Sequence, residues 1–130
     1  MEFSVTQEMG RVPVTVLRVE GAIDQDKPLV TKVQELFDTG MRNLLLDMSK
    51  VSFMNSLGLR AINQIFNLLR VPDEAESETT VMEGVRSGKY KSGHFKLLKP
   101  SKFVQDSLHM VGFDMFIEVF TDYQKAVDSF

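Results

Sequence analysis

Apolar residues along the chain fall into short strand-like runs, separated by stretches in which they recur every three or four positions. Residues 3–8 alternate weakly between apolar and polar, and residues 12–19 are rich in valine and contain Pro13. These segments predict two neighbouring strands, with the proline at an edge or a bulge because it cannot donate a ladder hydrogen bond. Residues 21–24, Gly-Ala-Ile-Asp, are expected to end the second strand.

A first helix is predicted after this strand. Asp26 is a typical helix cap, Pro28 fits the first turn, and Gly40 is a typical helix end. Between them, apolar residues form one stripe at helical spacing. These residues are Leu29, Val30, Val33, Leu36 and Phe37.

Three leucines at residues 44–46 follow, in a run too short for a typical helix. Such a run is typical of a strand buried on both faces of a parallel sheet. Asp47 and Ser49 are expected to mark the end of this strand, before a second apolar stretch at residues 51–54. Asn55 and Ser56 then cap a helix, because their side chains accept hydrogen bonds from free backbone amides. The apolar face of this helix comprises Leu59, Ile62, Ile65, Phe66 and Leu69.

The last third of the chain repeats the alternation of strand and helix. Residues 95–98 and 115–120 are predicted strands, and two helices are predicted to begin at Ser101 and at Asp122. The first of these helices carries Val104, Leu108 and Val111 on one side and ends at Gly112; the second carries Tyr123, Ala126, Val127 and Phe130. The alternation predicts one α/β domain over residues 1–130, with a mixed, mostly parallel sheet of about five strands packed against about four helices.

Residues 71–93 interrupt this rhythm. They hold acidic residues followed by basic ones, with few large apolar side chains. A connection of about twenty residues without periodicity is long for a compact domain. We expect a mobile, solvated insertion, within which Val81, Met82 and Val85 could form a short helix.

Composition excludes several classes of protein. The chain has no cysteine, so it has no disulfide and no thiolate nucleophile or metal ligand, and its two histidines, His94 and His109, lie far apart without a ligand pattern. We therefore expect no metal and no cofactor. No apolar run approaches the eighteen or so residues that a membrane span needs, and the N-terminus has no signal-like core. The expectation is a soluble cytoplasmic protein without a membrane partner.

A nucleic-acid partner is not favoured either. The net charge is −3, and the basic residues between 84 and 105 follow an acidic stretch that can neutralise them. A solvated, self-compensating loop is the simpler interpretation, with contact to a protein partner as the alternative. The eight methionines are most simply core-filling residues, with Met54 or Met110 as the alternative candidates for exposed, adaptable contacts.

Ser56 is the principal candidate for function. It is expected near the carboxyl edge of the sheet, at the positive end of a helix dipole, where an anion is favoured. One interpretation is that Ser56 is only a helix cap. The other is that it is a site for an anionic group.

The segment DMSKVSFMNSLGL, residues 47–59, resembles the central motif of bacterial anti-sigma factor antagonists in the STAS domain family. That motif is an acidic strand end, a short apolar stretch and then Asp-Ser-Ser/Thr-Gly-Leu. Residues 21–24 resemble the family's loop after the second strand, and residues 97–120 resemble its fourth strand, third helix and last strand. Two positions depart from the motif, because Asn55 stands in place of Asp and Leu57 in place of a small hydroxyl residue.

The resemblance implies a non-enzymatic signalling protein in transcription regulation. In the family, an anti-sigma factor with serine kinase activity uses ATP to phosphorylate the serine matching Ser56, and a serine phosphatase reverses this. The unmodified form binds the kinase, with Asp24 near the serine. The implied partner-binding residues are Asp24, Met54, Asn55, Ser56, Leu57, Gly58 and Arg60. A phosphate there is tolerated by the helix start but disrupts the partner surface, and Asp24 and Asp47 are expected to sharpen the negative field.

Two alternatives stay open. The chain could be a constitutive STAS interaction module without a phosphorylation cycle, in which Ser56 is merely a cap. It could instead be an enzyme with Ser56 as nucleophile, His94 or His109 as base and Asp24 or Asp47 as orienting group. The spacings do not favour the enzyme, and residues 55–59 lack the G-x-S-x-G elbow of serine hydrolases.

Overall fold

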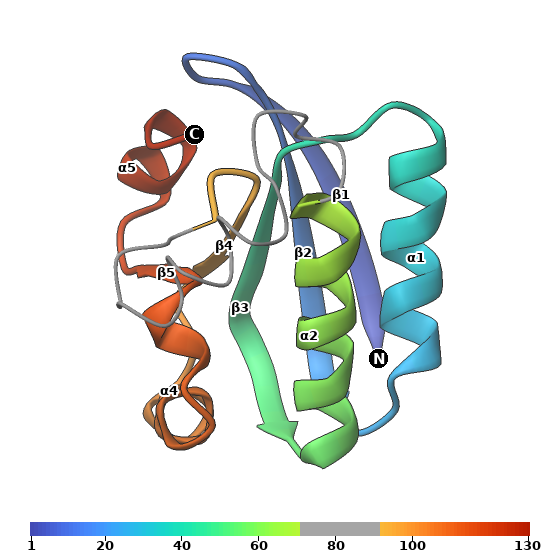
Figure 1. The fold of residues 1–130 in the computed structure, drawn as a ribbon, viewed down its shortest axis with the longest axis vertical. Helices are drawn as coiled ribbons and strands as arrows, with labels where there is room; N and C mark the ends of the chain where they lie inside the picture. The colour runs from blue at the N-terminus through green and yellow to red at the C-terminus, as the bar shows by residue number, and fades with distance from the viewer. Residues whose placement is uncertain (71–91) are drawn as a thin grey trace.

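A five-stranded mixed sheet forms the centre of the protein (Figure 1). The structure, a computed structural model, describes residues 1–70 and 92–130. The strands lie in chain order: β1 (Glu2–Met9), β2 (Pro13–Ile23), β3 (Leu44–Met54), β4 (Phe95–Leu98) and β5 (Glu118–Phe120). β1 is antiparallel to β2, whereas β2 through β5 are parallel to one another. The predicted mixed, mostly parallel sheet is confirmed.

Four α-helices connect or follow the strands within the described residues. They are α1 (Lys27–Asp38), α2 (Ser56–Arg70), α4 (Lys102–Met110) and α5 (Tyr123–Asp128). The predicted cap of α1 is confirmed, since the Asp26 side chain accepts a hydrogen bond from the amide of Lys27. Gly40 follows the helix with a φ of 112°, a left-handed conformation that glycine adopts without strain. Within the described ranges, no helix is both long and apolar enough to cross a membrane.

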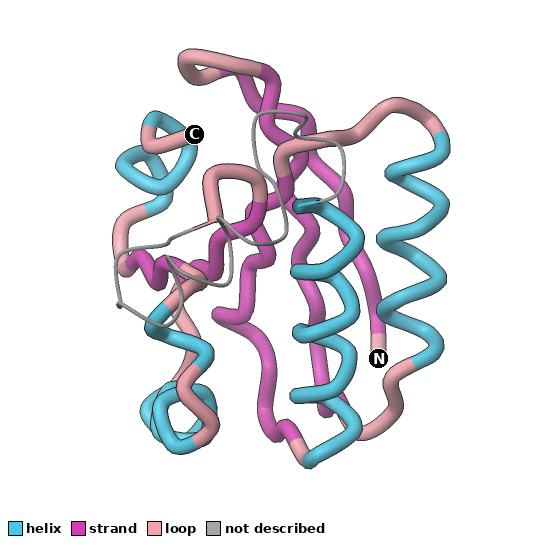
Figure 2. The backbone as a smooth tube through the Cα atoms, viewed as in Figure 1, coloured by secondary structure: helices cyan, strands magenta, loops and turns pink. Residues whose placement is uncertain are grey.

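The two faces of the sheet are covered unequally (Figure 2). Most buried apolar side chains lie between the sheet and the helices α1, α2 and α4, including Leu17, Leu46, Ile62 and Val104. A smaller cluster on the other face joins Val16 and Leu45 to α5. This division follows from strand geometry, because successive side chains such as Leu45 and Leu46 point to opposite faces.

Lys96 holds α5 against its face of the sheet. Its side chain is only 4% exposed, and Nζ donates to the carbonyl oxygen of Ser129 at 2.9 Å and to its hydroxyl at 3.0 Å. The carboxylate of Glu118 lies 3.6 Å from the same nitrogen, and the Phe130 ring centroid lies 4.9 Å away. These partners satisfy the ammonium group, which explains a lysine within a short buried strand.

β3 differs from its prediction. It does not end at Asp47 but spans 11 residues, from Leu44 to Met54. Asp47 is buried within it because Nε of Arg18 on β2 donates to its carboxylate at 3.2 Å. The paired charge lets an acidic residue remain inside a strand.

Three further sequence predictions are affected. Residues 113–115 form a short 3₁₀ helix, η1 (Phe113–Met115), so the last strand is shorter than predicted. Val111 is 49% exposed and does not join Val104 and Leu108 in the core. The predicted insertion lies outside the described residues except for its last two. Of these, Ser92 is buried, and its hydroxyl accepts hydrogen bonds from the backbone amides of His94 and Phe95.

Candidate functional site

The loops after β2 and β3 meet at the carboxyl edge of the sheet. Ile23 and Met54 are partners in the parallel register, so Asp24 and Asn55 leave the sheet side by side. The Asn55 amide N–H donates to the carbonyl of Ile23 at 3.4 Å, and its side-chain Nδ2 donates to the carbonyl of Asp24 at 3.3 Å. Two loops that are distant in the sequence are thereby joined beside Ser56.

Asn55 is the cap of α2. Its side-chain Oδ1 accepts hydrogen bonds from the amides of Leu57 at 3.0 Å and Gly58 at 3.2 Å, and its carbonyl accepts from Leu59 at 3.1 Å. Ser56 is the first residue of the helix, and its side chain is exposed. The interpretation of Ser56 as merely the cap is therefore wrong, because Asn55 caps the helix.

The first turn of α2 does not offset the positive end of the helix dipole. No acidic residue occurs there, and the cap is a neutral amide. The backbone amide of Ser56 has no acceptor among the described residues. The positive end of the helix dipole is thus presented beside an exposed hydroxyl, an arrangement that favours an anionic group.

Arg60 lies on the same side of the site. Its Nε is 3.7 Å from the carboxylate of Asp26, and its side chain is 66% exposed. Asp26 also caps α1, so this pair connects the starts of α1 and α2. The pair is long and Arg60 is mostly exposed, although the Asp26 side chain is only 19% exposed, so Arg60 stays available to another anion. Residues four positions apart share one face of a helix, which places Arg60 near any group on Ser56.

Gly58 and Met54 lie beneath the site rather than on it. Both are buried, so the expectation of an exposed Met54 is wrong, and a direct partner contact by Gly58 is not supported either. A Cβ atom on Gly58 would lie 2.5 Å from the carbonyl oxygen of Ile23 and 2.4 Å from Cγ of Met54. The glycine lets α2 approach the strand ends closely. Asp24, Leu57 and Arg60 keep exposed or half-buried positions beside Ser56.

The predicted acid and base groups are not assembled around Ser56. Asp47 is paired with Arg18 within the sheet, so it adds no free charge at the site. His94 precedes β4, where its Nδ1 lies 3.0 Å from Asn43 at the opposite end of the sheet. His109 lies at the end of α4 with Nδ1 2.7 Å from Asp114, whose hydrogen bond and charge raise the pKa of the histidine. Neither histidine lies at Ser56, and no side chain in the described residues forms a hydrogen bond with the Ser56 hydroxyl.

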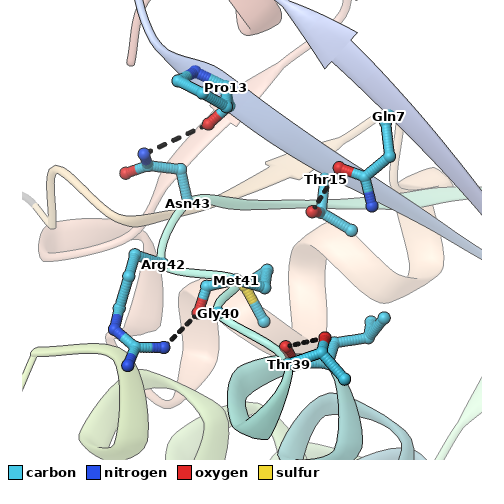
Figure 3. Close-up of a pocket in the computed structure, with 9 residues that line it drawn as sticks. Gln7, Pro13, Thr15, Thr39, Gly40, Met41, Arg42 and Asn43 are labelled. Carbon is cyan, nitrogen blue, oxygen red and sulfur yellow. Dashed lines mark hydrogen bonds between the residues drawn. The ribbon is translucent and has the colours of Figure 1, made fainter.

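A pocket of about 460 Å³ lies at the opposite end of the sheet from Ser56 (Figure 3). Its polar lining groups largely bond one another. Thr15 donates to Gln7, Asn43 donates to the carbonyl of Pro13, and Arg42 donates to the carbonyl of Met41. The first bond joins β2 to β1, the second joins the residue before β3 to the start of β2, and the third lies within the turn between α1 and β3, so we assign the pocket a structural role.

An exposed aromatic pair next to Ser56 was not predicted from the sequence. The rings of Phe53 on β3 and Phe103 on α4 are stacked with centroids 6.1 Å apart, and they are 44% and 57% exposed. Phe103 directly precedes Val104 and therefore lies off the buried stripe of α4. The position of Phe103 outside the apolar stripe could have indicated its exposure from the sequence. Phe53, by contrast, falls in an apolar stretch that suggests burial.

The family model for the STAS domain matches residues 5–71, more than half of the chain. The chain belongs to the STAS domain family. No curated protein sequence matches it at a significant level. The helix start at Ser56 therefore lies within the part that carries the family's own pattern.

Solved structures of two relatives have the same fold at low sequence identity. An anti-sigma factor antagonist from Mycobacterium paratuberculosis is 19% identical, with a TM-score of 0.66 over 97% of this chain and 92% of that one. The Bacillus cell fate determinant SpoIIAA in its phosphorylated form is 17% identical, with a TM-score of 0.62 over 96% and 97% of the two chains. Unphosphorylated SpoIIAA, an anti-sigma factor antagonist, has a TM-score of 0.60. These likenesses establish the STAS fold across the chain.

Proposed function

We propose that this protein is an anti-sigma factor antagonist that is switched by phosphorylation of Ser56. In this proposal the unmodified form binds an anti-sigma factor with serine kinase activity. That kinase uses ATP to phosphorylate Ser56 and so ends the complex, and a serine phosphatase restores the binding form. The protein itself performs no catalysis.

The observation that carries the proposal is the exposure of Ser56 at an uncompensated helix start. The neutral Asn55 caps the helix, which leaves the Ser56 hydroxyl free for a kinase. Membership of the STAS family and the fold shared with SpoIIAA, which was solved in a phosphorylated form, support the same role.

A phosphate on Ser56 would change the surface more than the fold. It adds about −1.5 to −2 charges and three acceptor oxygens. The Ser56 amide and the helix dipole can accommodate this charge, and Arg60 lies on the same helix face. A partner packed over Ser56 would instead have to bury an unpaired charge, which costs several kcal/mol or more. The phosphate therefore acts mainly by removing affinity for the partner.

Ser56→Ala tests the assignment of the phosphoacceptor. Purified anti-sigma factor kinases from the source genome are incubated with ATP and each variant, and intact mass and peptide mapping locate the phosphate. We expect one phosphate on the wild type and none on Ser56→Ala. Ser52→Ala is the matched control, because Ser52 is an exposed serine on the preceding strand, and it should be phosphorylated at the wild-type rate. A phosphate at another residue would contradict the proposal.

The alternative is a constitutive STAS interaction module. It is favoured by Asn55, which already satisfies the helix amides without a carboxylate. Ser56→Asp separates the two functions by isothermal titration calorimetry with the same kinases. The switch predicts a large loss of affinity, whereas the constitutive module predicts an unchanged dissociation constant.

A further inference from the structure

The exposed rings of Phe53 and Phe103 form a surface that the proposed switch does not explain. We call these two residues the aromatic pair. Together they leave on the order of 200 Å² of aromatic surface in water, taking about half of each full side chain. Aromatic residues, phenylalanine included, are enriched in the cores of protein interfaces relative to the rest of the protein surface.

Phe53 lies within the span of a standard interface centred on Ser56. Phe53 is three residues before Ser56, so their Cα atoms are separated by at most about 11 Å. A standard interface covers about 800 Å² on each partner, which corresponds to a radius of roughly 16 Å for a round patch. A patch of that size centred on Ser56 therefore extends to Phe53, on whose ring Phe103 is stacked.

Uncompensated positive charge flanks the aromatic pair on the α4 side. Lys102 is exposed in the first turn of α4, where the helix dipole disfavours a cation, and that turn has no acidic residue. Lys99 is also exposed and has a φ of 51°, an uncommon conformation for a lysine. No carboxylate among residues 1–70 and 92–130 forms an ion pair with either lysine. Acidic side chains of a partner would compensate both.

We propose that the aromatic pair is the apolar anchor for the anti-sigma factor, and that Lys102 pairs with an acidic side chain of that partner. This inference rests on the proposed function and identifies where the partner gains affinity outside Ser56. The patch extends from the carboxyl end of β3 onto the start of α4. The surface that the kinase binds is therefore formed by two segments distant in the sequence.

Affinity and phosphorylation kinetics of Phe103→Ala test the anchor. With the anti-sigma factor kinase that phosphorylates the wild type, we expect the dissociation constant to rise about ten-fold or more. In steady-state phosphorylation of Ser56, KM should rise while kcat is unchanged, because docking is lost but the acceptor is intact. Met9→Ala is the control, because Met9 is 73% exposed and pairs with Pro13 at the start of β2, at the opposite end of the sheet from Ser56; its affinity should change less than about two-fold.

Lys102→Glu provides an independent arm. The substitution favours the helix dipole but places a like charge four residues before Asp106, so thermal unfolding should show a protein about as stable as the wild type. Affinity for the kinase should nevertheless fall several-fold. This combination separates loss of docking from loss of folding.

The outcomes distinguish failure of the anchor from failure of the switch. If the kinase phosphorylates wild-type Ser56 but binds Phe103→Ala with unchanged affinity, the anchor is wrong and the switch stands. If no kinase of the source genome binds or phosphorylates the wild type, the switch fails and the anchor falls with it. If light scattering shows a wild-type dimer that Phe103→Ala converts to a monomer, the patch belongs to a second copy of the chain.

Discussion

Asn55 uses one amide group to stabilise both sides of the site. Its oxygen accepts from the amides of Leu57 and Gly58, and its nitrogen donates to the carbonyl of Asp24. An aspartate could provide the first set of bonds but could not donate. The departure from the family's Asp at this position thus adds a link between the two loops at the expense of a negative charge beside Ser56.

Substitutions of Asn55 measure these contributions. Asn55→Ala removes the cap and the link, and we expect it to lower the free energy of unfolding by about 1–2 kcal/mol. Asn55→Asp keeps the cap and gains from the helix dipole, so it should lie within about 1 kcal/mol of the wild type. Urea unfolding at neutral pH gives both values. An Asn55→Ala protein as stable as the wild type would show that the cap is not needed.

At the scale of elements, a histidine–carboxylate pair connects α4 to η1. His109 in the last turn of α4 lies 2.7 Å from Asp114, across the turn made by Gly112. The hydrogen bond to Asp114 and its charge raise the pKa of His109 above 6.5, with a smaller contribution from Asp106. The protonated histidine also suits the negative end of the helix dipole.

This pair predicts a pH dependence of the α4–η1 connection. Because the folded pKa of His109 exceeds the unfolded value of 6.5, its contribution to stability is complete below pH 6.5 and is lost as the pH rises through the folded pKa. NMR titration of the His109 ring should give a pKa above 6.5 in the wild type. In Asp114→Asn that pKa should return towards 6.5, and an unchanged value would show that Asp114 is not the cause.

At the scale of the whole molecule, the site depends on how closely α2 packs on the sheet. Gly58 is where the helix backbone meets the ends of β2 and β3. Alanine there would have to displace the carbonyl of Ile23, which belongs to the backbone and cannot rotate away. The position of Ser56 over the sheet edge therefore depends on a buried residue beneath it.

Gly58→Ala should destabilise the protein by about 1–3 kcal/mol through overpacking, although alanine is the better helix former by about 1 kcal/mol. Urea unfolding measures the change. Gly93→Ala is the control, because a Cβ at Gly93 meets nothing within 4 Å, and it should stay within about 0.5 kcal/mol of the wild type. Equal stability of the two variants would contradict the close approach.

Element types and most helix starts followed from local sequence signals. Asp26, Ser101 and Asp122 cap their predicted helices, because a cap needs only its own side chain and the next few amides. Parallel pairing followed from the alternation of strands and helices. The strand β3 was harder, since Asp47 suggests an exit until its partner Arg18 is known.

The sequence by itself determined the STAS fold, the helix start at residues 55–56 and Ser56 as the candidate site, because these depend on short-range periodicity, capping and a contiguous motif. Only the tertiary structure decided which side chains surround that site. It buried Met54 and Gly58, placed Asp47 against Arg18 and stacked Phe53 on Phe103. Exposure and pairing depend on which residues distant in sequence come together, and the register and packing of the sheet and its helices determine this.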